Sequence, residues 1–221
     1  MTFSILAHDP ETGAIGGAAA TGSLCVGGWV LRGTLAAGMS ASQGAAPSTF
    51  WGEDVLTRMA GGCDAETAVA RVTDADGGRA HRQLSALDLK GGTGAFTGHS
   101  NDDAKGSLDF AGGIAAGNML TDTGVLDAMA ARFTRERGSL DRRLLAALDA
   151  AAQAGGDFRG LLSAALLVLS PDRPPLTLRV DYHPDDPLAA LEALHHKATT
   201  GPYADWTRQV PVATDRARIL K

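Results

Sequence analysis

The pair Met1-Thr2 gives this sequence a chemistry that an internal threonine lacks. Methionine aminopeptidases remove an initiating methionine when the next side chain is small, and threonine qualifies. Removal of Met1 would give Thr2 a free α-amine, whose reference pKa of about 7.7–8.0 is close to working pH. That amine can act as general base for the hydroxyl of its own residue, whereas other hydroxyl nucleophiles need a separate base such as histidine. Thr2 is therefore the leading candidate nucleophile.

The segment that follows Thr2 has the alternation of a β-strand, in which successive side chains point to opposite faces. One face carries Thr2, Ser4, Leu6 and His8, and the other carries Phe3, Ile5 and Ala7. The polar pair Thr2 and Ser4 thus shares one face at the start of the strand. A strand without a flexible leader holds a nucleophile in a fixed position, and Ser4 is a candidate ligand-binding residue beside it.

The remaining sequence predicts strands in hairpins and helices in pairs. Strands are predicted at 14–20, 33–43, 82–89, 93–97, 108–116, 161–170 and 176–182, and helices at 51–59, from 64, at 125–133, at 140–148 and from 186. This order differs from the strict βαβ alternation of a doubly wound sheet. It favours an α/β protein of the α+β type, with two stacked antiparallel sheets and helices outside them: a four-layer αββα sandwich.

A length of 221 residues fits one domain better than two. We expect that domain to span 1–198 and to be followed by an irregular C-terminal arm at 199–221. The arm is polar but carries Tyr203, Trp206 and Val210, which water would otherwise surround. The sequence therefore predicts that the arm wraps the domain or a partner subunit, and that the protein is a homodimer.

Composition argues against several classes of protein. The net charge is −5 and no run of lysine or arginine exists, so nucleic acid is not an expected partner. The segment from Thr12 to Leu31 is uncharged but rich in glycine, which gives little transfer energy into lipid, so no membrane span is expected. Cys25 and Cys63 belong to no CxxC motif and are interpreted as reduced thiols of a cytoplasmic protein.

Common cofactor and catalytic motifs are missing from the sequence: GxSxG, the Walker A motif, GxGxxG after a strand, and HExxH. His195 and His196 are helix neighbours that point to different faces. The acidic group around Asp181, Asp185 and Asp186 is typical of a turn followed by a helix N-cap. We therefore expect no organic cofactor and no functional metal.

Five blocks of the sequence carry a resemblance to a known family. They are "MTFSILAHDPETGAIGGAAATGSLCVGG", "RQLSALD", "GN" at Gly117-Asn118, "AGGDFRGLLSAALLV" and "LRVDYHPDDP". Together, from Thr2 to about Leu194, they resemble a family of bacterial N-terminal-nucleophile (Ntn) hydrolase-like proteins, domain of unknown function 1028. The resemblance implies the αββα sandwich and matches Thr2 to the N-terminal nucleophile.

The resemblance also suggests roles for other residues. Asn118, at a strand end, matches the position of an oxyanion-hole asparagine, although a turn asparagine is an equal alternative. Asp157 and Arg159 either bind the substrate or pair with each other to hold their loop. Gln43 and Ser163 are candidates for orienting the nucleophile.

One departure from related enzymes keeps two functions open. Proteasome-like enzymes use a lysine near the nucleophile, and this chain has none after its early strands. The first hypothesis is an Ntn-type amidohydrolase acting on a small amide substrate. The second is a non-catalytic protein of the same fold that binds a small ligand or a partner in the same cleft.

Overall fold

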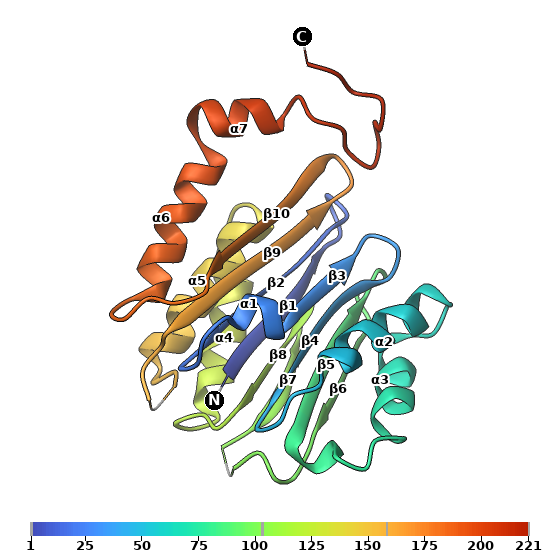
Figure 1. Cartoon of the computed structure of the whole chain (residues 1–221), viewed down its shortest axis with the longest axis vertical. Helices are drawn as coiled ribbons and strands as arrows, with labels where there is room; N and C mark the ends of the chain where they lie inside the picture. The colour runs from blue at the N-terminus through green and yellow to red at the C-terminus, as the bar shows by residue number, and fades with distance from the viewer. Residues whose placement is uncertain (1, 103, 158, 221) are drawn as a thin grey trace.

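The computed structural model describes residues 2–102, 104–157 and 159–220. Its larger sheet has six antiparallel strands in the order β10-β9-β2-β1-β8-β7 (Figure 1). Their bounds are β1 Thr2–Asp9, β2 Ala14–Thr21, β7 Gly106–Phe110, β8 Gly113–Asn118, β9 Ser163–Ser170 and β10 Arg173–Val180. β1 lies near the centre of this sheet, so the strand that begins at Thr2 is paired on both sides.

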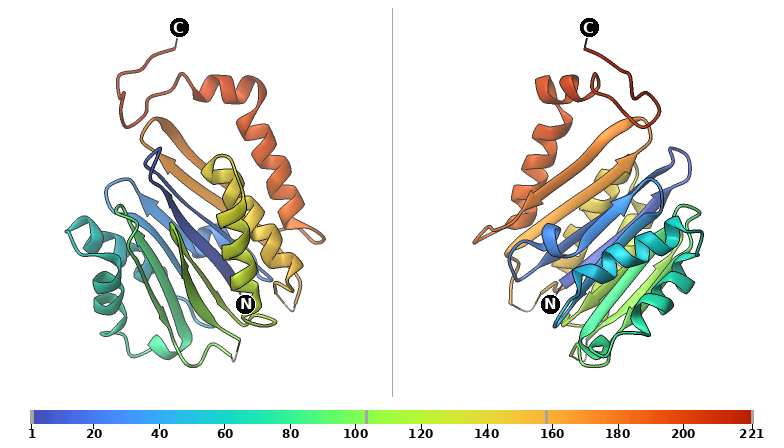
Figure 2. Two further views of the ribbon diagram at one scale, coloured as in Figure 1. Left: turned by 180° about the vertical axis from the view of Figure 1, so that it is seen from behind. Right: turned by 45° about the vertical axis from the view of Figure 1, so that its right-hand side comes forward.

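The smaller sheet is also antiparallel and has the order β3-β4-β5-β6. It consists of β3 Leu31–Thr34, β4 Gly38–Gly44, β5 Arg82–Asp88 and β6 Thr93–Thr97. Figure 2 shows the two sheets stacked face to face. Leu6 and Ile15 of the larger sheet pack there with Met39 and Leu87 of the smaller one, which forms an apolar layer between the sheets.

Helices cover the outer face of each sheet. The bounds are α1 Val26–Trp29, α2 Thr49–Ala60, α3 Ala65–Thr73, a 3-10 turn Arg79–His81, α4 Gly124–Arg135, α5 Leu140–Gln153, α6 Pro187–Thr199 and α7 Gly201–Thr207. α2 and α3 pack on the smaller sheet, and α4 and α5 pack on the larger one (Figures 1 and 2). The predicted four-layer α+β sandwich is confirmed.

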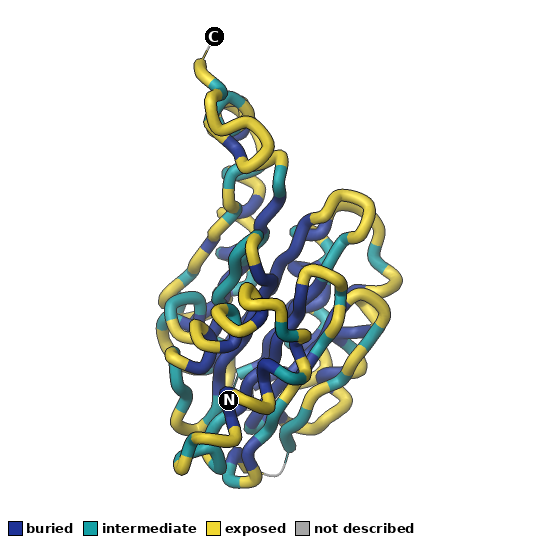
Figure 3. The backbone as a smooth tube through the Cα atoms, turned by 90° about the vertical axis from the view of Figure 1, so that its right-hand side faces the viewer, coloured by how far each residue is buried: buried dark blue, intermediate teal, exposed yellow. Residues whose placement is uncertain are grey.

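The burial pattern follows the alternation of the strands. Phe3, Ile5 and Ala7 of β1 face outward from the sandwich interior and pack with α4 and α5. A third apolar cluster, around Trp51 and Val55 of α2, lies outside the smaller sheet. Figure 3 shows buried residues following the strands through the middle of the molecule. Both faces of β1 are thus fixed by packing.

Two predicted strands are hairpins in the structure. Residues 33–43 were expected to form one strand but belong to β3 and β4, which pair with each other. Residues 108–116 were also expected to form one strand but divide into β7 and β8. The turns use Gly38 and Gly112, whose φ values of 132° and 91° favour glycine. Neither turn contains the proline or polar cluster that normally indicates one.

The sequence predicted an irregular C-terminal arm at 199–221. The structure differs, because the helix α7 occupies Gly201–Thr207 within it. After α7 the chain runs beside the β9–β10 turn, where the Thr214 amide donates to the Pro171 carbonyl at 3.0 Å. Within the described ranges no helix is long and apolar enough to cross a membrane.

The two ends of the sandwich have different connections. The five hairpins, β1–β2, β3–β4, β5–β6, β7–β8 and β9–β10, all turn at the end opposite Thr2, through short segments such as 10–13 and 111–112. The Thr2 end carries connections of four to nine residues, at 22–25, 45–48, 74–81, 98–105, 119–123, 154–162 and 181–186. Loops held by a rigid scaffold commonly carry function, so a functional site is expected at this end.

Candidate active site

Thr2 lies at a polar end of the space between the two sheets. The strand register places Thr21 and Asn118 opposite Thr2, one on each side. In the smaller sheet, Gln43 and Gln83 pair with each other. Four residues further along β1, Leu6 lies in the apolar layer. The interface between the sheets therefore changes from apolar to polar toward Thr2.

Two side chains hold Thr2. Its Oγ1 donates a hydrogen bond to Thr21 Oγ1 at 3.1 Å. Its carbonyl accepts a hydrogen bond from Gln43 Nε2, also at 3.1 Å, which joins the two sheets. Thr2 is partly exposed, whereas Thr21 and Gln43 are buried. The hydroxyl is thus fixed in place on a residue that is itself partly exposed.

Asn118 is the last residue of β8 and is fully buried. Neither Oδ1 nor Nδ2 of its carboxamide has a hydrogen-bond partner. Burial of such a group without a partner costs about 1–3 kcal/mol, so it needs an explanation. A donor left unused beside a nucleophile is a suitable group for binding the oxygen of a substrate carbonyl.

Other unsatisfied polar atoms lie in the same region. Among the described residues, the buried side-chain atoms without a partner are Ser4 Oγ, Gln43 Oε1, Ser85 Oγ, the two Asn118 amide atoms and His195 Nδ1. All except the histidine atom belong to strand residues that lie between the sheets toward the Thr2 end. Ser4 is completely buried, so it lies beneath Thr2 and not on an open surface.

Asp157 and Arg159 pair with each other. Arg159 Nη2 lies 2.8 Å from Asp157 Oδ2, and Arg159 Nε lies 3.0 Å from Oδ1. The hydrogen bond to Asp157 raises the pKa of the Arg159 guanidinium above its usual value. Asp157 Oδ2 also accepts from the Gly22 amide at 2.6 Å. Of the two roles that the sequence left open, these contacts support the loop-holding one.

Ser163 extends this support to the segment after β2. Its hydroxyl donates to the Ser23 carbonyl at 2.7 Å and accepts from the Val26 amide at 3.1 Å. It pairs with Thr21 in the sheet, one strand away from Thr2. Ser163 therefore positions the loop at 22–25 and is connected to Thr2 only through β2.

Strained backbone is concentrated at this end. The described non-glycine residues with positive φ are Cys25 at 60°, Asp102 at 62° and Met119 at 56°. Each lies in a loop at the Thr2 end, and Met119 directly follows Asn118. Such conformations cost about 1–3 kcal/mol and cluster at functional sites. Their common location is an independent indication of function here.

Gln83, at the start of β5, is a site residue that the sequence analysis missed. It is fully buried, and its Nε2 lies 2.9 Å from the carbonyls of both Gly106 and Gly117. Its Oε1 accepts from Gln43 Nε2 at 2.7 Å. The only sequence signal was that Gln83 shares a strand face with Ser85. That pattern indicates a polar patch, but it does not indicate which groups Gln83 contacts.

The predicted acidic cluster is structural. Asp186 caps α6 by accepting from the Ala189 amide at 2.9 Å. His183 Nδ1 accepts from the Asp186 amide at 2.9 Å. No group of three or more histidine, cysteine or acidic residues within the described ranges could hold a metal ion. Lys105, in a loop at the Thr2 end, donates its amine to the carbonyls of His99 and Asp102.

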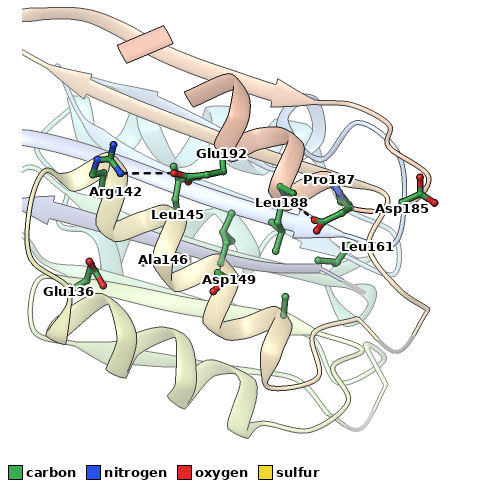
Figure 4. Close-up of a pocket in the computed structure, with 14 residues that line it drawn as sticks. Glu136, Arg142, Leu145, Ala146, Asp149, Leu161, Asp185, Pro187, Leu188 and Glu192 are labelled. Atoms are coloured by element: carbon green, nitrogen blue, oxygen red, sulfur yellow. Dashed lines mark hydrogen bonds and ion pairs between the residues drawn. The ribbon is translucent and has the colours of Figure 1, made fainter. Parts of the chain in front are cut away.

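A cavity of about 610 Å³ lies elsewhere, in the outer helical layer between α5 and α6 (Figure 4). Arg142 and Glu192 face each other across it at 4.0 Å. Its other lining groups include Asp149, Asp185 and Leu188. None of the predicted site residues lines this cavity, although Leu161, Asp185 and Asp186 of its lining belong to loops at the Thr2 end.

Comparison with known proteins identifies relatives but no activity. A crystal structure of protein SPO2555 from Silicibacter pomeroyi is 68% identical, with a TM-score of 0.96, and the match covers 100% of this chain and 96% of that one. SPO2555 is itself described as a DUF1028 protein. No curated protein matches this chain. The model of the "Family of unknown function (DUF1028)" matches residues 2–191, and the chain therefore belongs to this family.

Proposed function

We propose that the protein is an Ntn-type amidohydrolase, in which removal of Met1 exposes Thr2 for the hydrolysis of a small amide. One observation carries the proposal. The Thr2 hydroxyl, held by Thr21, lies at the head of a central strand directly opposite Asn118, whose buried carboxamide has no partner. A fixed nucleophile beside an unused hydrogen-bond donor is the minimum arrangement for acyl transfer.

The reaction needs no group beyond these residues and water. Thr2 Oγ1 attacks the amide carbon while its proton passes to the α-amine, and Asn118 Nδ2 donates to the oxygen that becomes negative. The α-ammonium then protonates the leaving amine, the C–N bond breaks, and an ester to Thr2 forms. Water, deprotonated by the α-amine, attacks the ester and releases a carboxylic acid and free Thr2.

Two further findings support this proposal over chemistry elsewhere in the molecule. The family model begins at residue 2, so Thr2 lies within the region that the family shares. The long loops and the strained residues Cys25, Asp102 and Met119 surround the same end of the sandwich. A binding protein without catalysis would use the same end, and the test must separate these two functions.

A peptide epoxyketone tests the nucleophile without a known substrate. This reagent reacts with the hydroxyl and the amine of an N-terminal threonine to close a ring, so intact mass increases by the whole reagent. We expect an adduct on Met1-cleaved protein and on Thr2→Ser. We expect none on Thr2→Ala, or on protein that retains Met1 because methionine aminopeptidase was inhibited during expression.

The same four samples are then assayed on a library of small chromogenic amides. Turnover should fall about 10⁴-fold or more in Thr2→Ala and in Met1-retained protein, the scale at which nucleophile loss is felt. Equal behaviour of all four samples in both assays would remove Thr2 from any mechanism. The non-catalytic binding function would then stand in its place.

A further inference from the structure

Two glutamines form a hydrogen-bonded path across the sandwich at its polar end. The carbonyl of Thr2 accepts from Gln43 Nε2, and Gln43 Nε2 also donates to Gln83 Oε1. Gln83 Nε2 then reaches the Gly117 carbonyl in the larger sheet at 2.9 Å. Gly117 precedes Asn118, so the path links the strand of the nucleophile to the strand of the proposed oxyanion donor.

The surroundings of Gln83 determine which way its amide faces. Its Nε2 lies 2.9 Å from the Gly106 and Gly117 carbonyls and 2.8 Å from Thr97 Oγ1. The reversed amide would place an oxygen against two carbonyl oxygens, which repel it. Gln83 therefore presents its Oε1 to Gln43, and amide orientation is assigned from such networks.

The orientation of Gln83 in turn determines that of Gln43. Gln43 Nε2 lies between two oxygens, Gln83 Oε1 at 2.7 Å and the Thr2 carbonyl at 3.1 Å. Both of its hydrogens are therefore used, and Oε1 is left as an acceptor. Gln43 is 1% exposed and this oxygen has no donor partner. The buried carboxamide of Gln43 is thus already hydrogen-bonded to the Thr2 carbonyl, but its Oε1 lacks a donor.

We infer that Gln83 is a positioning residue, which holds Gln43 so that its Oε1 accepts a hydrogen bond from the α-amine of Thr2. The inference rests on the proposed function, because Met1 removal converts the Thr2 amide, which has one N–H, into an amine with further hydrogens to donate. A neutral amide then orients the general base. Gln43 contacts the base directly, and Gln83 acts only through Gln43.

Because the groups around Thr2 are neutral, the pKa of its α-amine should respond to the loss of a single hydrogen bond from Gln43. Thr21, Asn118, Gln43 and Gln83 face it from the neighbouring strands and are all neutral. Among the charged groups at this end, Asp157 pairs with Arg159, Lys105 bonds to carbonyls, and Arg82, the first residue of β5, pairs with Asp76. An acceptor for the ammonium form favours that form, so loss of the acceptor lowers the pKa of the amine.

The experiment measures the epoxyketone rate against pH in wild type, Gln83→Met, Gln43→Met and the control Gln153→Met. The control changes an exposed glutamine at the end of α5, in the outer helical layer. The rate rises with pH as the amine loses its proton. Both buried variants should lower the plateau about tenfold and move the midpoint to lower pH. The control should match wild type. Destabilisation alone changes the amount of folded protein but leaves the midpoint in place.

Unchanged midpoints in Gln83→Met and Gln43→Met would overturn the inference while leaving Thr2 as nucleophile. If Gln83→Met does not fold, the Gln43→Met midpoint decides, since Gln83 acts only through that residue. A wild type that forms no adduct would instead overturn the proposed function itself. The two failures are therefore distinguishable.

Discussion

Thr2 Oγ1 and Thr21 Oγ1 lie 3.1 Å apart, at the ends of two paired strands. Either hydroxyl can donate to the other, because a hydroxyl hydrogen rotates to suit its partners. Thr21 can therefore accept the Thr2 hydrogen at rest and, in the proposed mechanism, donate to Thr2 Oγ1 once that hydrogen has moved to the amine. The pair fixes the position of the oxygen in both states.

Replacement of Thr21 by valine tests this pair, since valine has the same shape without the hydroxyl. We expect Thr21→Val to remain folded and to form the epoxyketone adduct about 2- to 10-fold more slowly, the worth of one hydrogen bond. The matched control is Thr177→Val on the exposed face of β10. Equal rates in the two variants would show that Thr21 does not position the nucleophile.

Asp157→Asn tests whether the Asp157–Arg159 pair is structural. The Asp157 side chain is 0% exposed and accepts from both Arg159 and the Gly22 amide. We expect unfolding in urea to show a loss of about 1.5–3 kcal/mol, because hydrogen bonds to a charged group are lost. Asp149→Asn, on an exposed surface of α5, should change stability by less than about 0.5 kcal/mol.

The same variant separates the two roles that the sequence left open for this pair. A structural role predicts that Asp157→Asn loses stability while folded molecules still react with the epoxyketone. Unchanged stability with lost binding of small amides would instead support substrate binding by Asp157.

Asp141 and His195 should make stability depend on acid pH. His195 Nε2 of α6 lies 2.5 Å from Asp141 Oδ2 of α5. Burial raises the pKa of Asp141, but hydrogen bonds with His195 and Ser139 outweigh it and lower the pKa from 3.8 to about 2. A depressed folded-state pKa contributes stability that is present above the unfolded value and lost as pH falls toward the folded value.

We therefore expect about 2 kcal/mol of stability to be lost between about pH 4 and pH 2. Urea unfolding at a series of pH values measures it. Asp141→Asn should be less stable at neutral pH, and its stability should fall less steeply over the acid range. A variant curve parallel to that of wild type across this range would contradict the assignment to Asp141.

The C-terminal segment exposes apolar side chains through which we predict a dimer contact. Tyr203 is 56% exposed and Trp206 is 48% exposed on α7, and Ile219 and Leu220 are also exposed. We expect light scattering at micromolar concentration to give the mass of a dimer. The double variant Tyr203→Ser with Trp206→Ser should give a monomer. A wild-type monomer under the same conditions would rule out the dimer.

The sequence predicted most accurately those features that depend only on residues close together in the chain. Strand alternation from Thr2 to His8 predicted the faces of β1, because each face has its own packing layer. The N-cap at Asp186 was predicted for a similar reason, since capping depends on residues close in sequence.

The partners of the site residues could not be predicted from the sequence. Thr21 and Asn118 flank Thr2 only because β1 lies between β2 and β8 in the sheet. Gln43 meets Thr2, and Gln83 meets Gly117, only because the second sheet stacks on the first. Sheet order and stacking depend on the whole chain, so no short motif indicates them.

At the end of the sandwich opposite Thr2, the strands are connected only by hairpin turns, so a peptide tag could be inserted there without disturbing the loops around Thr2. The turn from Pro10 to Gly13 is exposed, and its chain leaves β1 at the end opposite Thr2. Exposed loop tips of this kind tolerate inserted sequence. A reporter peptide inserted at Glu11 would allow the protein to be immobilised on a sensor surface with Thr2 and its loops facing the solution.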